Sequence, residues 1–125
     1  MILGIGADLV EITRIESSLR RNGDRLAKRI LTPEELQRYF KHVKKAHYLA
    51  TRFAAKEATV KALGTGFADS ITWKQVNIAN NEKGMPVLTL TGKARERADA
   101  LGVSRLHISI SDEKHYAVAF VILES

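Results

Sequence analysis

Apolar and polar side chains alternate along residues 2–9, and this period of two predicts a strand at the start of the chain. One face of the strand carries the apolar side chains Leu3, Ile5, Ala7 and Leu9, and the other carries Gly4, Gly6 and Asp8. Because the two glycines have no side chain, another group can approach the backbone on their face. Asp8 is therefore expected beside an open stretch of main chain.

Helical spacing of apolar residues follows in the first half of the chain. Residues 11–22 show this spacing and are followed by Gly23, a natural end for a helix. The segment Thr32-Pro33-Glu34-Glu35 combines a capping threonine, a proline in the first position and an acidic first turn, so it marks the start of another helix. A long helix is predicted over residues 44–63, and it ends at Gly64.

The second half is predicted to contain four strands and one helix. The strands are expected at residues 71–79, 86–91, 106–111 and 116–123, and the helix at 92–101. The resulting order β-α-α-α-β-β-α-β-β is typical of an α+β fold. We therefore predict a single domain over residues 1–125, with a largely antiparallel sheet and the long helix packed on it.

Composition narrows the class of protein. The chain has 125 residues, 45% of them hydrophobic and 27% charged, which suits one globular domain. It has no run of 18 apolar residues, so no membrane span is expected, and its N-terminus lacks the basic region of a signal peptide. The absence of cysteine excludes disulfides and cysteine nucleophiles and fits a reducing compartment. We therefore expect a cytoplasmic protein.

The net charge of +6 lies entirely in the first half of the chain. Residues 1–62 carry 13 Lys and Arg against 7 Asp and Glu, whereas residues 63–125 carry 7 of each. The densest group of cations comprises Arg14, Arg20, Arg21, Arg25, Lys28 and Arg29. Such a surface attracts an anionic partner, which could be nucleic acid, membrane, an acidic protein or a phosphorylated small molecule. A solvated basic face without a partner is the alternative.

Two carboxylates are candidates for a metal site. An aspartate such as Asp8 at a strand end is often only a turn former or helix cap. Glu57 is less ordinary, because it lies about 40° from Phe53 around the long helix, at the edge of its apolar stripe. It needs a cation there, and Lys61 one turn later is the simplest candidate. Two carboxylates without histidine or cysteine would instead favour a magnesium ion.

Basic residues and a glycine turn lie close to Glu57 in the sequence. Arg52, Lys56 and Lys61 are followed by Gly64-Thr65-Gly66, a combination that suits a pyrophosphate ligand. The turn lacks the Gly-Lys-Ser/Thr of a P-loop, and residues 4–9 lack the third glycine of a dinucleotide fingerprint. The residues by themselves therefore predict a magnesium and phosphate site and no particular reaction.

Two motifs carry a resemblance to a known family. Residues 52–66, RFAAKEATVKALGTG, resemble the signature of the holo-acyl-carrier-protein synthases, which are 4′-phosphopantetheinyl transferases. Residues 4–11, GIGADLVE, with Arg14-Ile15-Glu16 after them, are similar to the N-terminal motif of that family. Later blocks also match, at Gly84-Met85-Pro86, His107-Ile108-Ser109-Ile110-Ser111 and Tyr116-Ala117-Val118-Ala119. The resemblance runs in order along essentially the whole chain.

The resemblance implies a reaction and a partner. The family moves 4′-phosphopantetheine from coenzyme A to a serine of apo-acyl carrier protein in fatty acid biosynthesis and releases adenosine 3′,5′-bisphosphate. Asp8 and Glu57 match its magnesium ligands, and Lys61 matches its active-site lysine. The base for the serine proton would be Glu57 or a water that Asp8 holds on the metal. The family also implies a homotrimer with sites between subunits.

The remaining site residues follow from the same comparison. We expect coenzyme A to contact Arg52, Lys56, Lys61, Gly64, Thr65, Gly66 and Ser109. The acidic helix of the carrier protein would dock on the basic first helix, at Arg14, Arg21 and Arg25.

One position departs from the family pattern. Many members have a histidine after the Ser-x-Ser strand, where this chain has Asp112, and a histidine comes only at His115. An aspartate would repel a phosphate of coenzyme A. His107, Ser109 and Ser111 share a strand face and could line the ligand instead, or they could form a half-buried polar face. His42 and His47 are expected on the surface.

Two other functions are compatible with the basic charge. A small α+β nucleic-acid-binding module would explain it, but the few aromatic residues do not cluster on one strand as a stacking platform. A non-catalytic scaffold could bind an acidic protein through Arg14 to Arg29. Transfer from coenzyme A would distinguish the enzyme from both.

Overall fold

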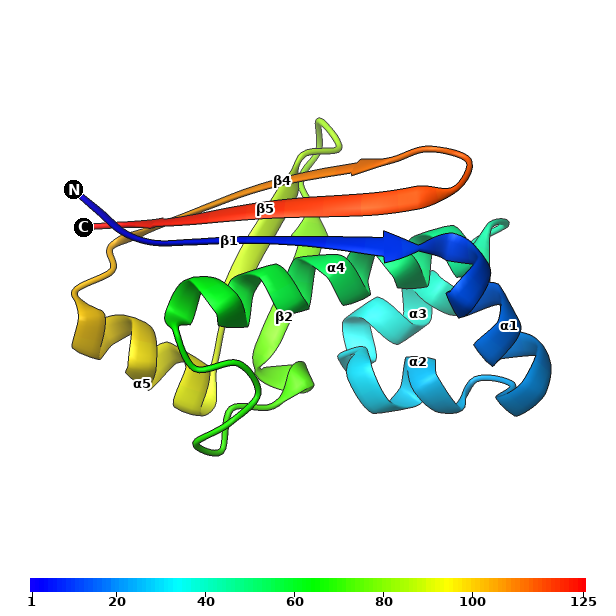
Figure 1. Cartoon of the computed structure of the whole chain (residues 1–125), viewed down its shortest axis with the longest axis horizontal. Coiled ribbons are helices and arrows are strands. Elements are labelled where there is room, and N and C mark those ends of the chain that lie inside the picture. The colour runs from blue at the N-terminus through cyan, green and yellow to red at the C-terminus, as the bar shows by residue number, and fades with distance from the viewer.

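A long helix lies beneath a three-stranded antiparallel sheet in the computed structural model, which describes residues 1–125 (Figure 1). The helices are α1 (Ile12–Asn22), α2 (Arg25–Ile30), α3 (Pro33–Lys41), α4 (Lys45–Leu63) and α5 (Gly92–Leu101). The strands are β1 (Ile2–Glu11), β2 (Val76–Asn80), β3 (Pro86–Leu90), β4 (Arg105–Asp112) and β5 (Tyr116–Glu124). No helix is both long and apolar enough to cross a membrane.

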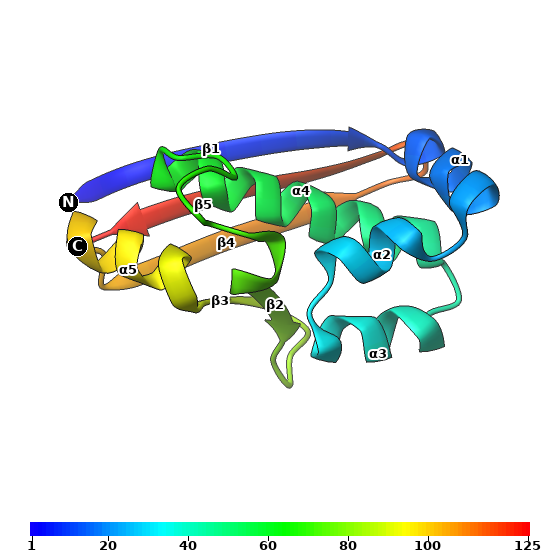
Figure 2. The same ribbon diagram turned by 90° about the horizontal axis from the view of Figure 1, so that it is seen from below.

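The strands form two separate antiparallel sheets. The larger one has the order β1-β5-β4, so β5 pairs with both of its neighbours, and Asp8 of β1 lies opposite Ala119 of β5. The smaller one is the hairpin β2-β3. Seen from below, α1, α2 and α3 gather at one end of α4, and α5 lies at the other (Figure 2). The predicted α+β fold with a long helix on an antiparallel sheet is confirmed.

Two local predictions were wrong. The chain forms a short helix, α2, that the sequence pattern did not separate from its surroundings; it buries Ala27 and Ile30 and has no side-chain cap. The strand expected over 71–79 begins only at Val76, because Trp73–Gln75 form a 3₁₀ turn. The carbonyl groups of Trp73 and Val76 accept hydrogen bonds from the Lys56 side chain instead of from a strand partner.

The main chains of β1 and α4 approach each other directly. A Cβ atom on Gly4 would collide with the carbonyl oxygen of Ala62, and one on Gly6 would collide with that of Ala58. The space that the glycines leave is therefore filled by the helix, whose facing residues are alanines. Gly4, Gly6 and Asp8 point inward to α4, as does the buried Val10, whereas Ile5 and Leu9 of β1 point outward.

An apolar surface covers the outer face of the larger sheet. Ile5 and Leu9 of β1 are 68% and 63% exposed, and Phe120 and Ile122 of β5 are 56% and 39% exposed. The register places Ile5 opposite Ile122, so these side chains adjoin across the strands. We call these four residues, with Val118 between Phe120 and the β4-β5 turn, the outer apolar face.

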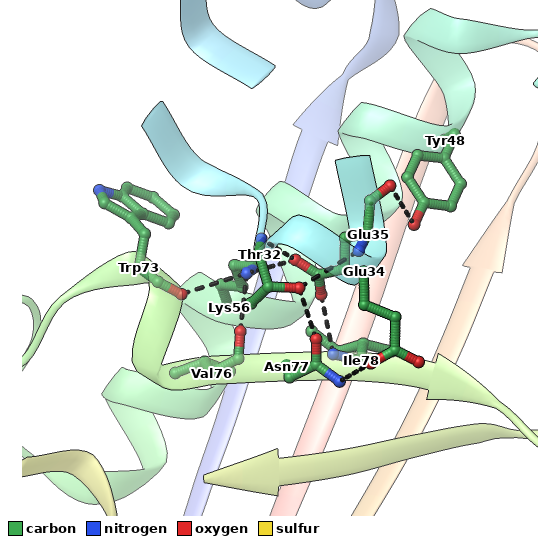
Figure 3. Close-up of polar contacts among 9 residues, drawn as sticks. All are labelled: Thr32, Glu34, Glu35, Tyr48, Lys56, Trp73, Val76, Asn77 and Ile78. Carbon is green, nitrogen blue, oxygen red and sulfur yellow. Dashed lines mark hydrogen bonds and ion pairs between the residues drawn. The ribbon is translucent and has the colours of Figure 1, made fainter. Parts of the chain in front are cut away.

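A buried ion pair joins α3, α4 and β2 (Figure 3). The Lys56 ammonium lies 2.7 Å from a Glu35 carboxylate oxygen, and neither side chain is more than 1% exposed. Glu35 also accepts hydrogen bonds from the backbone N–H groups of Thr32, as part of the predicted helix cap, and of Ile78. Burial lowers the pKa of Lys56, and the carboxylate of Glu35 opposes this shift.

This placement corrects the prediction that Lys56 contacts coenzyme A. The three hydrogens of its ammonium group are directed at Glu35 and at the carbonyl oxygens of Trp73 and Val76. Because the side chain is 0% exposed, it has no donor left for a ligand. Lys56 therefore holds the core together.

We expect Lys56→Met to destabilise the protein by about 3–5 kcal/mol, because it leaves the Glu35 charge buried without a partner. Adding Glu35→Gln should restore part of this loss, since the charge is then removed as well. Thermal and urea unfolding would measure both changes. Lys61→Met serves as the control, because this side chain is exposed, and it should melt close to the wild type. An equal loss of stability in both single variants would contradict the assignment of Lys56 to the core.

Candidate active site

Asp8, Glu57 and Lys61 come together where β1 crosses α4. Asp8 follows the glycines on the inner face of β1, and its side chain is 16% exposed. The Lys61 ammonium lies 3.1 Å from an Asp8 carboxylate oxygen and 3.1 Å from the carbonyl oxygen of Ala7. Lys61 thus forms its ion pair with the strand, and not with Glu57 one turn earlier on its own helix. The close packing of β1 on α4 sets this arrangement.

Glu57 lies half-buried without an ion pair. Burial raises the pKa of its carboxyl group, the neighbouring charge of Asp8 raises it further, and Lys61 lowers it in part. Two carboxylates thus share one nearby cation, and the charge of Glu57 is not compensated. A divalent cation would compensate it, and oxygen ligands of this kind suit magnesium. No group of three or more His, Cys, Asp or Glu side chains is arranged to hold a metal, so the protein would supply only these two.

A cavity of about 580 Å³ opens beside Asp8. Arg14 and Arg21 of α1 lie along one side of it, and Phe53 of α4 lies along another. The first helix therefore brings two of the predicted partner-binding arginines to the same cavity as the carboxylate. Arg25 is exposed at the start of α2 and does not line the cavity. We call this space the Asp8 cavity.

A second cavity, of about 620 Å³, is strongly basic. Its positively charged or titratable basic residues are Arg38, Lys41, His42, Lys44, His47 and Arg52, and we call it the basic pocket. The only carboxylate that lines it is Asp112. Most of these residues were not predicted as site residues, because they come from α3, the loop after it and α4 and form no contiguous motif. The excess of positive charge in the first half of the chain was their only signal.

Arg52 anchors the inner wall of the basic pocket. It is 6% exposed, donates a 2.7 Å hydrogen bond to Asn80, and its guanidinium lies 4.5 Å from the centre of the Tyr48 ring. Its Nε atom is buried without a hydrogen-bond partner. Arg52 and Glu57 are five residues apart, so they project about 140° apart around α4. The carboxylate of Glu57 and the basic pocket therefore lie on different sides of α4, and the Asp8 cavity, which α4 lines only with Phe53, shares no residue with the basic pocket.

The other residues predicted to contact coenzyme A either lie on another face of the sheet from Asp8 or already use their backbone N–H groups in hydrogen bonds within the chain. Gly64 ends α4 in a left-handed conformation with φ of 80°, and the backbone N–H groups of Gly64, Thr65 and Gly66 all donate to carbonyl groups in the last turn of α4. Ser109 is exposed on the outer face of β4, which is the opposite face of the sheet from Asp8. A single chain therefore does not bring Ser109 to the carboxylates.

The side chains of three of the four histidines have defined hydrogen-bond partners. His47, expected on the surface, is only partly exposed, and its Nδ1 atom lies 3.1 Å from the carboxylate of Asp112. His42 is exposed, and its Nδ1 atom accepts a hydrogen bond from the backbone N–H of Lys44. His107 lies on the outer side of β4 and pairs with Glu124 at 3.0 Å.

Known proteins match this chain in sequence and in fold along its whole length. A holo-[acyl-carrier-protein] synthase of Vibrio campbellii is 52% identical over 124 residues, which are 99% of this chain and 98% of that protein. The crystal structure of the holo-[acyl-carrier-protein] synthase from Neisseria meningitidis superimposes with a TM-score of 0.93, at 39% identity and over 100% of both chains. A synthase from Bacillus anthracis in complex with CoA (3′,5′-ADP) has a TM-score of 0.83 at 36% identity, over 100% of this chain and 98% of the other.

The match extends to the family level. The family model of the 4′-phosphopantetheinyl transferase superfamily covers residues 4–121, which include most of β1 with Asp8, α4 with Glu57 and Lys61, and most of β5. This chain is therefore a member of the 4′-phosphopantetheinyl transferase superfamily.

Proposed function

We propose that this protein is a holo-acyl-carrier-protein synthase of fatty acid biosynthesis. It transfers 4′-phosphopantetheine from coenzyme A to a serine hydroxyl of apo-acyl carrier protein and releases adenosine 3′,5′-bisphosphate. The observation that carries the proposal is the convergence of Asp8, Glu57 and Lys61, from two separate elements, beside a cavity bordered by basic residues. Relatives of the same length bear this name, and solved relatives bind coenzyme A.

Asp8 and Glu57 are the residues that would hold a magnesium ion. The uncompensated carboxylate of Glu57 supports this assignment, because the charge of a cation would offset the burial and the repulsion from Asp8 that raise its pKa. A bound magnesium ion would supply positive charge to the pyrophosphate of coenzyme A. The protein contributes only two ligands, and this is typical of magnesium sites that also use substrate phosphates and water.

Lys61 and Glu57 have separate tasks in the proposed reaction. The ammonium of Lys61 is half-exposed beside Asp8 and would stabilise the negative charge that develops on the leaving phosphate. The proton of the attacking serine hydroxyl would pass either to the carboxylate of Glu57 or to a water molecule held at Asp8. The serine would approach through the Asp8 cavity, where the cavity is open to solvent.

The carrier protein would dock on α1. Arg14 and Arg21 border the Asp8 cavity and Arg25 follows on α2, so an acidic helix placed there brings its serine toward Asp8. Positive charge around the entrance also speeds the approach of an acidic partner. We expect neither nucleic acid nor membrane as a partner, and a reducing compartment such as the cytoplasm suits a chain without cysteine.

The protein would act as a homotrimer with sites between subunits. The outer apolar face would be buried in such an assembly, whereas a monomer would leave it in water. Coenzyme A carries phosphates at two places, the pyrophosphate and the 3′-position. In one chain the carboxylates and the basic pocket lie on different sides of α4, so one molecule would reach the carboxylates of one subunit and the basic pocket of the next.

The transferase activity can be tested by mass spectrometry of an apo-acyl carrier protein incubated with the protein, coenzyme A and magnesium. We expect the carrier protein to gain the mass of one phosphopantetheine group. Lys61→Met should lower kcat by about 10²–10³, because it removes a preorganised charge from the transition state. Its melting temperature should remain nearly unchanged. Absence of any mass increase with the wild type would refute the proposed activity, and normal turnover by Lys61→Met would exclude this residue from the site.

Magnesium binding can be tested by melting, without any turnover. A ligand at ten times its Kd stabilises the folded state by about 1.4 kcal/mol, so saturating magnesium should raise the Tm of the wild type by several degrees. Asp8→Asn and Glu57→Gln should each abolish this rise. Glu82→Gln, in the exposed β2-β3 turn, is the matched control and should behave as the wild type. A rise that is the same in all four proteins would place the ion elsewhere.

Sites between subunits can be tested by mixing two inactive variants. Lys61→Met damages the carboxylate side, and Arg38→Glu with Lys44→Glu damages the basic pocket through two exposed residues. If each site combines parts of two chains, co-expression of the two variants should restore activity at one of the three sites in each mixed trimer, which is about a quarter of all sites when the chains mix at random. Ultracentrifugation would establish that the mixed species are trimers. If each chain held a whole site, mixing would restore nothing.

A further inference from the structure

The contact between His47 and Asp112 joins α4 to β4 at the wall of the basic pocket. The Nδ1 atom of His47 lies 3.1 Å from a carboxylate oxygen of Asp112. Asp112 follows Ile110 on the face of β4 that points to α4, so the strand directs its side chain toward the helix. The two side chains are 25% and 43% exposed, and such ion pairs add little to stability. The contribution of this pair to folding is therefore too small to account for a carboxylate in a pocket of cations.

The partner of each histidine determines which ring nitrogen carries a proton. A carboxylate can only accept, so the Nδ1 atom of His47 must be the donor to Asp112. His42 has the opposite arrangement, because its Nδ1 atom accepts from the backbone N–H of Lys44. The nitrogen of His47 that is left for a ligand is therefore Nε2. When the ring is cationic, Nε2 carries a hydrogen and can donate it to a phosphate oxygen.

The charges around His47 explain why its ring needs Asp112 in order to donate to a phosphate. The charged and titratable groups that line the basic pocket with His47 are Arg38 and Lys41 of α3, His42 and Lys44 of the following loop, Tyr48 and Arg52 of α4 and Asp112 of β4. All except Tyr48 and Asp112 are cationic or can become so, and they disfavour a further positive charge. The carboxylate of Asp112 offsets this repulsion and fixes the orientation of the ring.

We propose that His47 binds the 3′-phosphate of coenzyme A through Nε2 and that Asp112 is the positioning residue that holds it in the binding state. This rests on the proposed function, because it takes coenzyme A as the ligand of the basic pocket. Asp112, the one carboxylate in the pocket, thus increases phosphate affinity by acting through His47. A carboxylate that acted only by its own charge would decrease that affinity.

Asp112 either increases phosphate affinity through His47 or decreases it by its own charge, and the direction of the change in affinity on Asp112→Ala distinguishes the two roles. The probes are adenosine 3′,5′-bisphosphate and adenosine 5′-monophosphate, which lacks the 3′-phosphate, and their Kd values are measured by calorimetry at pH 6.5. His47→Gln should weaken binding of the bisphosphate about ten- to a hundredfold, as expected for a charge-assisted hydrogen bond, and leave the monophosphate unchanged. Asp112→Ala should weaken binding of the bisphosphate severalfold. Glu113→Ala, which removes a neighbouring exposed charge outside the pocket, is the control and should have little effect.

The double variant completes the test. With His47→Gln already present, Asp112→Ala should strengthen binding, because only its repulsion remains to be removed. Tighter binding by Asp112→Ala alone would overturn the inference and leave the proposed function intact. If the wild type bound neither coenzyme A nor the bisphosphate, the proposed function and the inference would fail together.

Discussion

The site depends on the contact between the main chains of β1 and α4. Gly4 and Gly6 have no side chain, and the helix presents Ala58 and Ala62 to them, so strand and helix pack at backbone distance. A methyl group on either glycine would force the two elements apart. The position of Asp8 relative to Glu57 and Lys61 is set by the same contact, because Asp8 follows Gly6 by two residues on the same face. A packing constraint thereby fixes an electrostatic arrangement.

The buried ion pair of Glu35 and Lys56 secures α4 from its opposite side. Its carboxylate binds backbone N–H groups of α3 and β2, and its ammonium binds carbonyl groups on either side of the 3₁₀ turn. The charged groups of Glu35 and Lys56 therefore all have partners, and the desolvation of the two charges is offset. The helix that carries Glu57 and Lys61 is held by the sheet above and by this network below (Figures 1 and 3).

The sequence predicts the elements of this fold better than it predicts their burial. Periodicity and caps identify the long helix and most of the strands, since these signals are local. Lys56 and Lys61 show the limit: both are lysines of one helix beside Glu57, yet one is in the core and the other is half-exposed. The difference comes from Glu35, which is distant in sequence.

The basic pocket was missed for the same reason, because its residues meet only after α3, α4, β2 and β4 have packed. The family resemblance supplied what local patterns lacked for Asp8, whose partner Lys61 is 53 residues away.

The position of β5 between β1 and β4 has a consequence for the order in which the molecule forms. β1 has no other strand partner, so the segment that carries Asp8 can be fixed in the sheet only when residues 116–124 are available. Pairing the two ends closes a loop of more than a hundred residues, and contacts between such distant segments slow folding. On the ribosome, residues 1–63 emerge with Asp8, Glu57 and Lys61 all present, but their arrangement awaits the synthesis of a strand that contributes no side chain to them.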